Sequence, residues 1–115
     1  MGAEITYREI GDVTIIDVSG RITLGEGSSS FREVIHDLVK RGQKLFLLNL
    51  AEVSFIDGSG IAELVSAFTT VANHGGQLKL LSPTARVRDL LQITKLYTVF
   101  EVFDDEAEAV RSFGS

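Results

Sequence analysis

The chain has 115 residues, 44% of them hydrophobic and only one of them proline, a composition that favours one compact domain. Its formal net charge is −5 and its basic residues form no run, so we expect no nucleic-acid partner. The absence of cysteine excludes disulfides, thiolate metal sites and a cysteine nucleophile.

No segment has the pattern of a secretion signal or a membrane span. The N-terminus lacks a basic stretch followed by an apolar one. The longest apolar runs are far shorter than the ~20 residues that a transmembrane helix needs. We therefore expect a cytoplasmic protein without direct membrane insertion.

The N-terminal segment predicts a β-hairpin followed by a loop. Ile5–Ile10 and Val13–Val18 are rich in Ile, Val, Thr and Tyr, and they flank Gly11-Asp12, which predicts the hairpin. The segment Gly20–Ser30 holds three glycines and three consecutive serines. This composition predicts a loop or turn.

A first helix is expected after this loop. Ser30 and Glu33 fit a capping box, in which the two side chains satisfy free backbone N–H groups reciprocally. Apolar residues then recur at helical spacing, namely Phe31, Val34, Ile35, Leu38 and Val39. Gly42 is the expected end of this helix.

The centre of the chain predicts a buried strand and a second helix. Leu45–Leu48 is apolar without alternation, which is typical of a parallel strand covered on both faces. A connection over Ala51–Asp57 leads into a helix that ends at Gly75-Gly76. The buried stripe of this helix is expected at Ile61, Leu64, Val65, Phe68 and Ala72.

The C-terminal part alternates strands and helices again. Leu78–Leu81 predicts a strand, Pro83-Thr84 opens a third helix, Val99–Phe103 predicts a last strand, and Asp104–Phe113 predicts a closing helix. Residues 1–115 thus predict a single α/β domain with about four to five strands and about four α-helices.

The candidate chemistry lies in Asp57-Gly58-Ser59-Gly60. The flanking glycines make Ser59 an accessible hydroxyl at a helix N-terminus, where the peptide dipoles tolerate added negative charge. The position follows a parallel strand, at the edge where open α/β sheets build their sites. Such a serine suits a phosphorylated switch. On side-chain chemistry alone an ordinary helix cap is the more common role, because Ser59 or Asp57 can each cap the helix for about 1 kcal/mol, and a capping serine can still be modified.

We find no assembled enzyme site, and we expect no catalytic activity, metal or cofactor. Gly58-Ser59-Gly60 is not the G-x-S-x-G elbow of serine hydrolases, and Gly25-Glu26-Gly27 lacks the GK[ST] ending of a phosphate loop. The two histidines have no metal-ligand spacing. We expect His36 on the solvated side of the first helix and His74 in the last turn of the second.

The sequence resembles a STAS domain over nearly all its length, in particular the single-domain anti-sigma-factor antagonists of bacterial partner-switching systems. Val53–Ile61 looks like the family signature of an Asp, a small residue, the phosphorylated Ser and a Gly. Val18–Ile22 is similar to the end of the family's second strand, and Leu80–Ala109 is similar to its C-terminal third. The resemblance implies the STAS fold with a mixed β-sheet.

The resemblance also implies a protein-binding switch. In such systems the unphosphorylated protein binds an anti-sigma factor with serine kinase activity and so releases the sigma factor. The kinase phosphorylates the serine that matches Ser59, the complex dissociates, and a serine phosphatase resets the protein. Carried over to this sequence, Ser59 is the phosphorylation site, and the expected partner-binding residues are Asp57, Gly58, Ser59, Gly60 and Ile61.

Two positions depart from the family pattern, and two other functions stay open. Gly58 stands where many members have Ser, and Asn49 stands where many have Asp at the end of the central strand. STAS domains also serve as constitutive accessory subunits, for example of membrane transporters. Some members have been suggested to bind nucleotides, although no basic or glycine-rich cradle supports this here.

Overall fold

The computed structural model describes residues 4–23 and 26–113, the side chains of 26–30 excepted. Over these residues the strands are β1 (Glu4–Ile10), β2 (Val13–Ile22), β3 (Leu45–Ile56), β4 (Gln77–Leu81) and β5 (Val102–Phe103). The helices are α1 (Glu26–Lys40), α2 (Gly58–Asn73), α3 (Ala85–Ile93) and α4 (Glu106–Phe113), with a 3-10 turn at Leu96–Thr98.

The strands form one mixed sheet in the order β1-β2-β3-β4-β5. β1 and β2 are antiparallel, whereas the β2–β3, β3–β4 and β4–β5 pairs are parallel. The hairpin turn is Gly11-Asp12, where Gly11 has a φ of +59°, as the first position of a two-residue type II′ turn requires. The five strands and four α-helices confirm the fold class predicted from the sequence.

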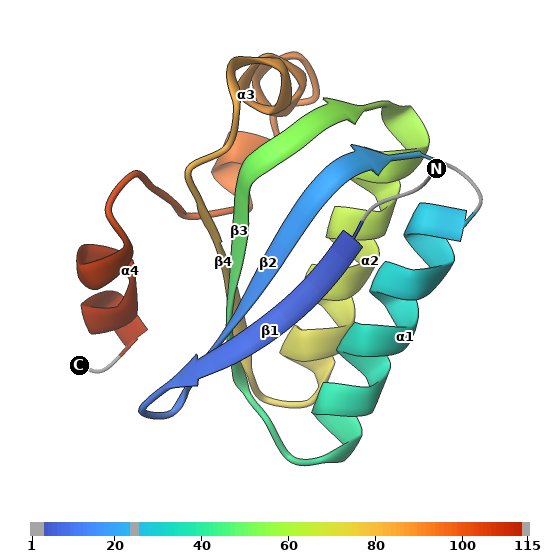
Figure 1. Ribbon diagram of the computed structural model, residues 1–115. Coiled ribbons are helices and arrows are strands. Elements are labelled where there is room, and N and C mark those ends of the chain that lie inside the picture. The colour runs from blue at the N-terminus through green and yellow to red at the C-terminus, as the bar shows by residue number, and fades with distance from the viewer. Residues whose placement is uncertain (1–3, 24–25, 114–115) are drawn as a thin grey trace.

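Helices cover both faces of the sheet (Figure 1). α1 and α2 lie on one face, and α4 lies on the other. Phe46 and Leu48 of β3 belong to the larger core beneath α1 and α2, whereas Leu47 joins Ala109 of α4 in a second cluster. All three β3 side chains are fully buried, which confirms the interpretation of the apolar run as a central parallel strand.

β3 is longer than the apolar run that predicts it. Exposed Ala51 and Glu52 interrupt the hydrophobic pattern, but the strand continues to Ile56, so the predicted connection over Ala51–Asp57 is wrong. Two register shifts against β2 insert an extra β3 residue each. Such bulges change which side chains face inward. Val53 and Ile56 both enter the core, and Phe55 takes the opposite face from Ile56.

Three further boundaries differ from the sequence-based expectations. β2 continues to Ile22 and α1 begins at Glu26, so the predicted Gly20–Ser30 loop is too long. Ser30 lies inside α1 rather than at its N-terminus, and the predicted capping box is therefore wrong. The predicted Val99–Phe103 strand is too long, because only its last two residues pair, as β5.

The helix α2 packs against both the sheet and α1, and this widens its buried face. Ile61 and Leu64 are buried as predicted, but Ala72 is exposed. Ala67 and Val71 are buried instead. The sequence stripe therefore predicts the sheet-facing side of α2 and misses the side that contacts α1.

Candidate functional site

The Asp57–Ile61 segment lies where β3 ends and α2 begins (Figure 1). Asp57 is the N-cap residue of α2, with an extended backbone at φ −119° and ψ −171°. Gly58 and Ser59 are the first two residues of the helix. The structure thus places Ser59 at a helix N-terminus, at the edge of the sheet formed by the C-terminal ends of its parallel strands.

The side chain of Asp57 organises this helix start. Its Oδ1 accepts a hydrogen bond of 2.9 Å from the Gly60 backbone N–H and another of 2.7 Å from the Ser59 hydroxyl. The Ser59 hydroxyl, followed by the Gly60 N–H, holds the pKa of Asp57 below its ordinary value. The sequence leaves open whether Ser59 or Asp57 caps the helix. In the structure Asp57 is the cap, and the Ser59 hydroxyl donates a hydrogen bond to its carboxylate.

The five predicted partner-binding residues differ in accessibility. Gly58 is exposed, and Asp57 and Ser59 are half-buried, so all three reach the surface. Gly60 is buried, and Ile61 is only 5% exposed because it packs in the core under α2. Only Asp57, Gly58 and Ser59 are therefore accessible from the surface, and Gly60 and Ile61 lie beneath them.

Gly60 allows α2 to approach the sheet closely. A Cβ at this position would lie 2.1 Å from the Ile22 carbonyl oxygen and 2.6 Å from Cγ1 of Ile56. No side chain larger than hydrogen fits there without movement of β2 or α2. A Cβ at Gly58, by contrast, would have no described atom within 4 Å outside its immediate chain neighbours. Gly60 therefore allows the short distance between the start of α2, which carries Ser59, and the end of β2.

A groove runs beside the exposed part of the segment, between the end of β3 and α3. Phe55, Asp57 and Gly58 line one side, and Arg86 and Asp89 of α3 line the other. Phe55 and Arg86 are also in stacking contact. Sequence reasoning assigned no role to Arg86, because the chain positions of α3 and β3 do not reveal that the two meet. Only the folded topology brings Arg86 to the serine segment.

Comparison with known proteins identifies the family. The family model of the STAS domain matches residues 4–109. The chain belongs to the STAS domain family. This confirms the resemblance inferred from the Val53–Ile61 motif and its flanking patterns.

Two relatives of this STAS domain are named as regulators of sigma-factor inhibitors. One is the anti-sigma F factor antagonist of Paenibacillus polymyxa, 22% identical over 96% of this chain and 94% of the relative. The other is the anti-sigma-B factor antagonist of Bacillus subtilis, 29% identical over 76% of this chain and 78% of the relative. Both names describe regulatory rather than catalytic proteins.

Solved structures share the fold of this STAS domain. A Thermotoga maritima crystal structure, assigned provisionally to the anti-sigma factor antagonists, has a TM-score of 0.89 and 23% identity, covering 96% of this chain and 95% of the other. The phosphorylated form of SpoIIAA, described as a Bacillus cell fate determinant, has a TM-score of 0.75 and 19% identity, covering 95% and 98%.

Asn49, one of the two departures from the family pattern, belongs to a polar network on the α4 face. Its amide donates a 2.8 Å hydrogen bond to Asp17, and its side-chain oxygen accepts from the Ala51 N–H. Arg8 binds Asp17 and also Glu106 of α4, and these bonds raise the pKa of Arg8 above its ordinary range. Asn49 thus joins β3 to β2 and contributes no charge of its own.

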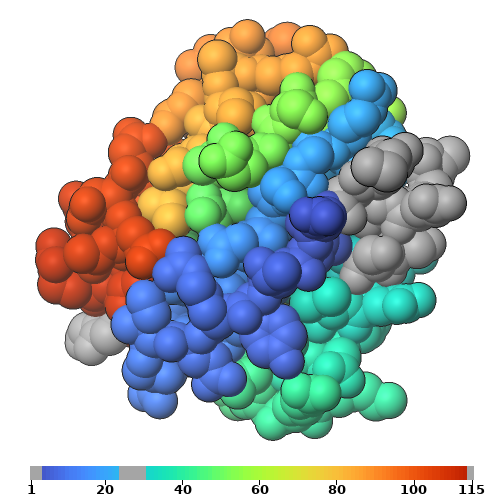
Figure 2. Space-filling model, viewed as in Figure 1, coloured from blue at the N-terminus to red at the C-terminus, as the bar shows by residue number. Residues whose placement is uncertain are grey.

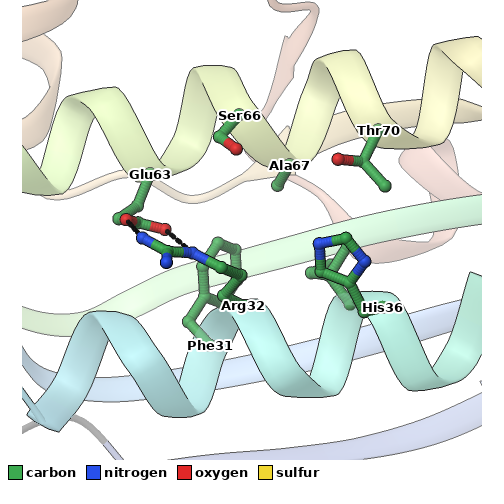
Figure 3. A pocket seen from close by; sticks show the side chains of 8 residues that line it. Phe31, Arg32, His36, Glu63, Ser66, Ala67 and Thr70 are labelled. Carbon is green, nitrogen blue, oxygen red and sulfur yellow. Dashed lines mark hydrogen bonds and ion pairs between the residues drawn. The ribbon is translucent and has the colours of Figure 1, made fainter.

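A second, smaller pocket lies between α1 and α2 of the STAS domain (Figure 3). Arg32 of α1 forms an ion pair with the nearly buried Glu63 of α2. His36 lines the same pocket and is exposed, as the sequence predicts. His74 caps the C-terminus of α2, with its Nδ1 2.8 Å from the Thr70 carbonyl oxygen. His36 thus lies at the surface between two helices, and His74 contacts the last turn of α2.

Residues 4–23 and 26–113 hold neither a metal-binding cluster nor a membrane-spanning helix. No group of three or more His, Cys, Asp or Glu side chains in these ranges could hold a metal ion. None of the helices in the same ranges combines the length and apolar character needed to cross a bilayer.

Proposed function

We propose that this STAS domain is an anti-sigma factor antagonist that binds an anti-sigma factor until Ser59 is phosphorylated. The observation that carries the proposal is the position of the Ser59 hydroxyl, which reaches the surface at the first turn of α2 beside the carboxylate of Asp57. The names of the relatives support the partner class. On this basis the protein acts by binding, and the kinase supplies the chemistry.

The charge added by phosphorylation explains the release. A phosphate on Ser59 brings about −1.5 to −2 charge at neutral pH. The N-terminus of α2 can accept this charge within the free protein. A partner surface that fits a neutral hydroxyl cannot, because it would shut the phosphate away from water beside the Asp57 carboxylate, and like charges in an interface cost several kcal/mol. A penalty of ~3–4 kcal/mol weakens binding several-hundred-fold.

The hydrogen-bond pattern allows this charge change without unfolding. Loss of the Ser59 hydroxyl proton removes one bond to Asp57, but the Gly60 N–H still donates to the same carboxylate. The helix cap therefore survives modification of the serine. We expect the phosphorylated protein to keep its fold and to change only its affinity.

The switch requires two protein partners. The anti-sigma factor is itself the serine kinase that modifies Ser59, and a serine phosphatase restores the free hydroxyl. Asp57, Gly58 and Ser59, which all reach the surface, form the centre of the contact with the kinase. We place the protein and its partners in the cytoplasm.

A pull-down from native lysate tests this function. The bait proteins are the wild type, Ser59→Ala, Ser59→Asp and the control Ser66→Asp, which adds the same charge at an exposed position of α2. We expect a serine kinase with wild type, Ser59→Ala and Ser66→Asp, and its loss with Ser59→Asp. Phosphate incorporation from ATP should occur in the wild type and be absent in Ser59→Ala.

Other outcomes would contradict the proposal. Equal capture of the kinase by wild type and Ser59→Asp would rule out the charge switch. Phosphorylation that persists in Ser59→Ala would rule out the acceptor residue. Capture of a membrane transporter by all four baits would instead identify a constitutive accessory subunit.

A further inference from the structure

Two arginine side chains stack on one aromatic ring beside the Ser59 segment. The guanidinium carbon of Arg21 lies 4.7 Å from the centre of the Phe55 ring, and that of Arg86 lies 4.3 Å from it. Arg21 is paired with Phe55 in the β2–β3 register, and Arg86 lies in the first turn of α3. We call Arg21, Phe55 and Arg86 the arginine patch.

The arginine patch lies on an open surface. The ends of β2 and β3 and the helix α3 form one continuous surface in the space-filling view (Figure 2). Arg21 and Arg86 are exposed, and Phe55 is half-buried beneath them. This stacking also explains the half-buried Phe55, which faces away from the core side of β3.

The charges of the arginine patch are available for a partner. Of the nine other basic side chains, all in the described residues, five are held in ion pairs (Arg8, Arg32, Arg41, Lys79 and Arg88), and Lys40, Lys44, Lys95 and Arg111 are not. Within the described residues Arg21 and Arg86 have no such carboxylate, and they contact the ring instead. In a chain of net charge −5, the patch is a local concentration of positive charge.

Stacking prepares the guanidinium groups to bind carboxylates. Each guanidinium carbon lies over the Phe55 ring, and a guanidinium held on a ring in this way can still offer N–H groups for a two-pronged bond to a carboxylate. A side chain already held on a surface loses less rotamer freedom when a partner binds. The patch therefore favours an acidic group over a neutral or basic one.

The patch is continuous with the Ser59 segment. Phe55 and Arg86 line the same groove as Asp57 and Gly58. Asp57 and Asp89 also line this groove and repel an acidic group placed beside them. An acidic segment can therefore bind in one position, with its carboxylates on the arginines and its neutral part at the serine.

We infer that Arg21 and Arg86, held on Phe55, dock an acidic segment of the protein whose binding Ser59 controls. The identity of that protein as an anti-sigma factor rests on the proposed function. The patch makes binding selective for an acidic partner and speeds association, because complementary charges guide the two proteins toward each other. Ser59 supplies the release.

The first test needs no partner. A short glutamate–glycine repeat peptide is titrated into the full chain and followed by NMR, with a lysine–glycine repeat as the control. We expect the acidic peptide to shift the amide signals of Arg21, Phe55 and Arg86, and the shifts to disappear in high salt and in Arg86→Glu. Shifts spread over all basic residues, or none at the patch, would overturn the inference.

The second test uses the kinase retrieved with the Ser59 variants. We expect Arg21→Glu and Arg86→Glu each to weaken binding about tenfold or more and to slow association, with partial recovery in Arg86→Lys. Arg111→Glu, which makes the same charge change on α4, should bind within about twofold of the wild type. Thermal unfolding of each variant separates lost docking from lost stability.

The two proposals fail in different ways. If Ser59→Asp releases the kinase while both arginine variants bind like the wild type, the docking inference is wrong and the switch stands. If the arginine variants weaken binding while Ser59→Asp does not, the switch is wrong and the docking surface stands.

Discussion

Gly60→Ala tests the close packing that positions Ser59. The added carbon would lie 2.1 Å from the Ile22 carbonyl oxygen and 2.6 Å from Cγ1 of Ile56. Ordinary contacts between heavy atoms are about 3.5 Å, so the start of α2 or the end of β2 must move by roughly 1 Å. Forcing an extra carbon into a packed site costs about 1–3 kcal/mol.

The sign of the effect follows from two opposed contributions. Alanine is favoured over glycine inside a helix by at most about 1 kcal/mol. The clash involves a backbone oxygen, which cannot rotate away as a side chain can, so we place the steric cost at the upper end of its range. The expected net loss in the free energy of unfolding is about 2 kcal/mol, or roughly 8 °C in Tm.

Urea unfolding followed by circular dichroism measures this loss, and Gly58→Ala is the matched control. It makes the same substitution two residues earlier, where no described atom lies within 4 Å of the new carbon outside its immediate chain neighbours. We expect Gly58→Ala to be neutral or to stabilise by up to about 1 kcal/mol. If Gly60→Ala were as stable as Gly58→Ala, the proposed approach of α2 to β2 would be refuted.

Two further substitutions test the charges around the site and between the helices. The Ser59 hydroxyl lowers the pKa of Asp57, so the Asp57 cap stabilises the fold above the unfolded-state pKa of about 3.9, and this contribution is lost as pH falls through the lower folded-state pKa. Asp57→Asn should equal the wild type at pH 7, because Asn caps as well, and should lose less stability in acid unfolding; identical acid profiles would contradict this. Arg32→Ala should destabilise more than exposed Arg41→Ala in urea, because it leaves the nearly buried carboxylate of Glu63 unpaired; equal losses would contradict the ion pair.

The sequence predicts the strands and helices where side-chain pattern and local backbone agree. Gly11-Asp12 supplies the turn geometry of the hairpin, and Phe46, Leu47 and Leu48 are buried on both faces of the sheet. These features depend on residues close together in the chain. The Ser59 position follows in the same way, because Asp57 caps α2 through its own neighbours.

The hydrophobic pattern of the sequence does not predict features that depend on contacts between distant parts of the chain. Ala51 and Glu52 carry no apolar signal, yet pairing with β2 and two register shifts extend β3 to Ile56. Ala67 is buried where α1 packs beside α2, and the apolar stripe predicted for α2 does not include it. Val99 and Phe100 have strand composition, but a 3-10 turn precedes them.

The sequence reveals the consecutive residues of the candidate site and not the residues that the fold brings beside them. Asp57, Gly58 and Ser59 lie consecutively, so their motif is visible in the sequence. Arg21 and Arg86 are separated by much of the chain, and they meet on Phe55 only after β2, β3 and α3 assemble. Both arginines are basic residues in an acidic chain, which the sequence shows. That both are exposed is known only from the fold.

The affinity of one purified anti-sigma factor for the two forms of Ser59 is the most direct test of the proposed switch. Isothermal titration calorimetry of the unphosphorylated and the Ser59-phosphorylated protein, in the same buffer, gives both dissociation constants. We expect phosphorylation to weaken binding several-hundred-fold, which corresponds to ~3–4 kcal/mol. Equal dissociation constants for the two forms, with both proteins folded, would contradict the switch.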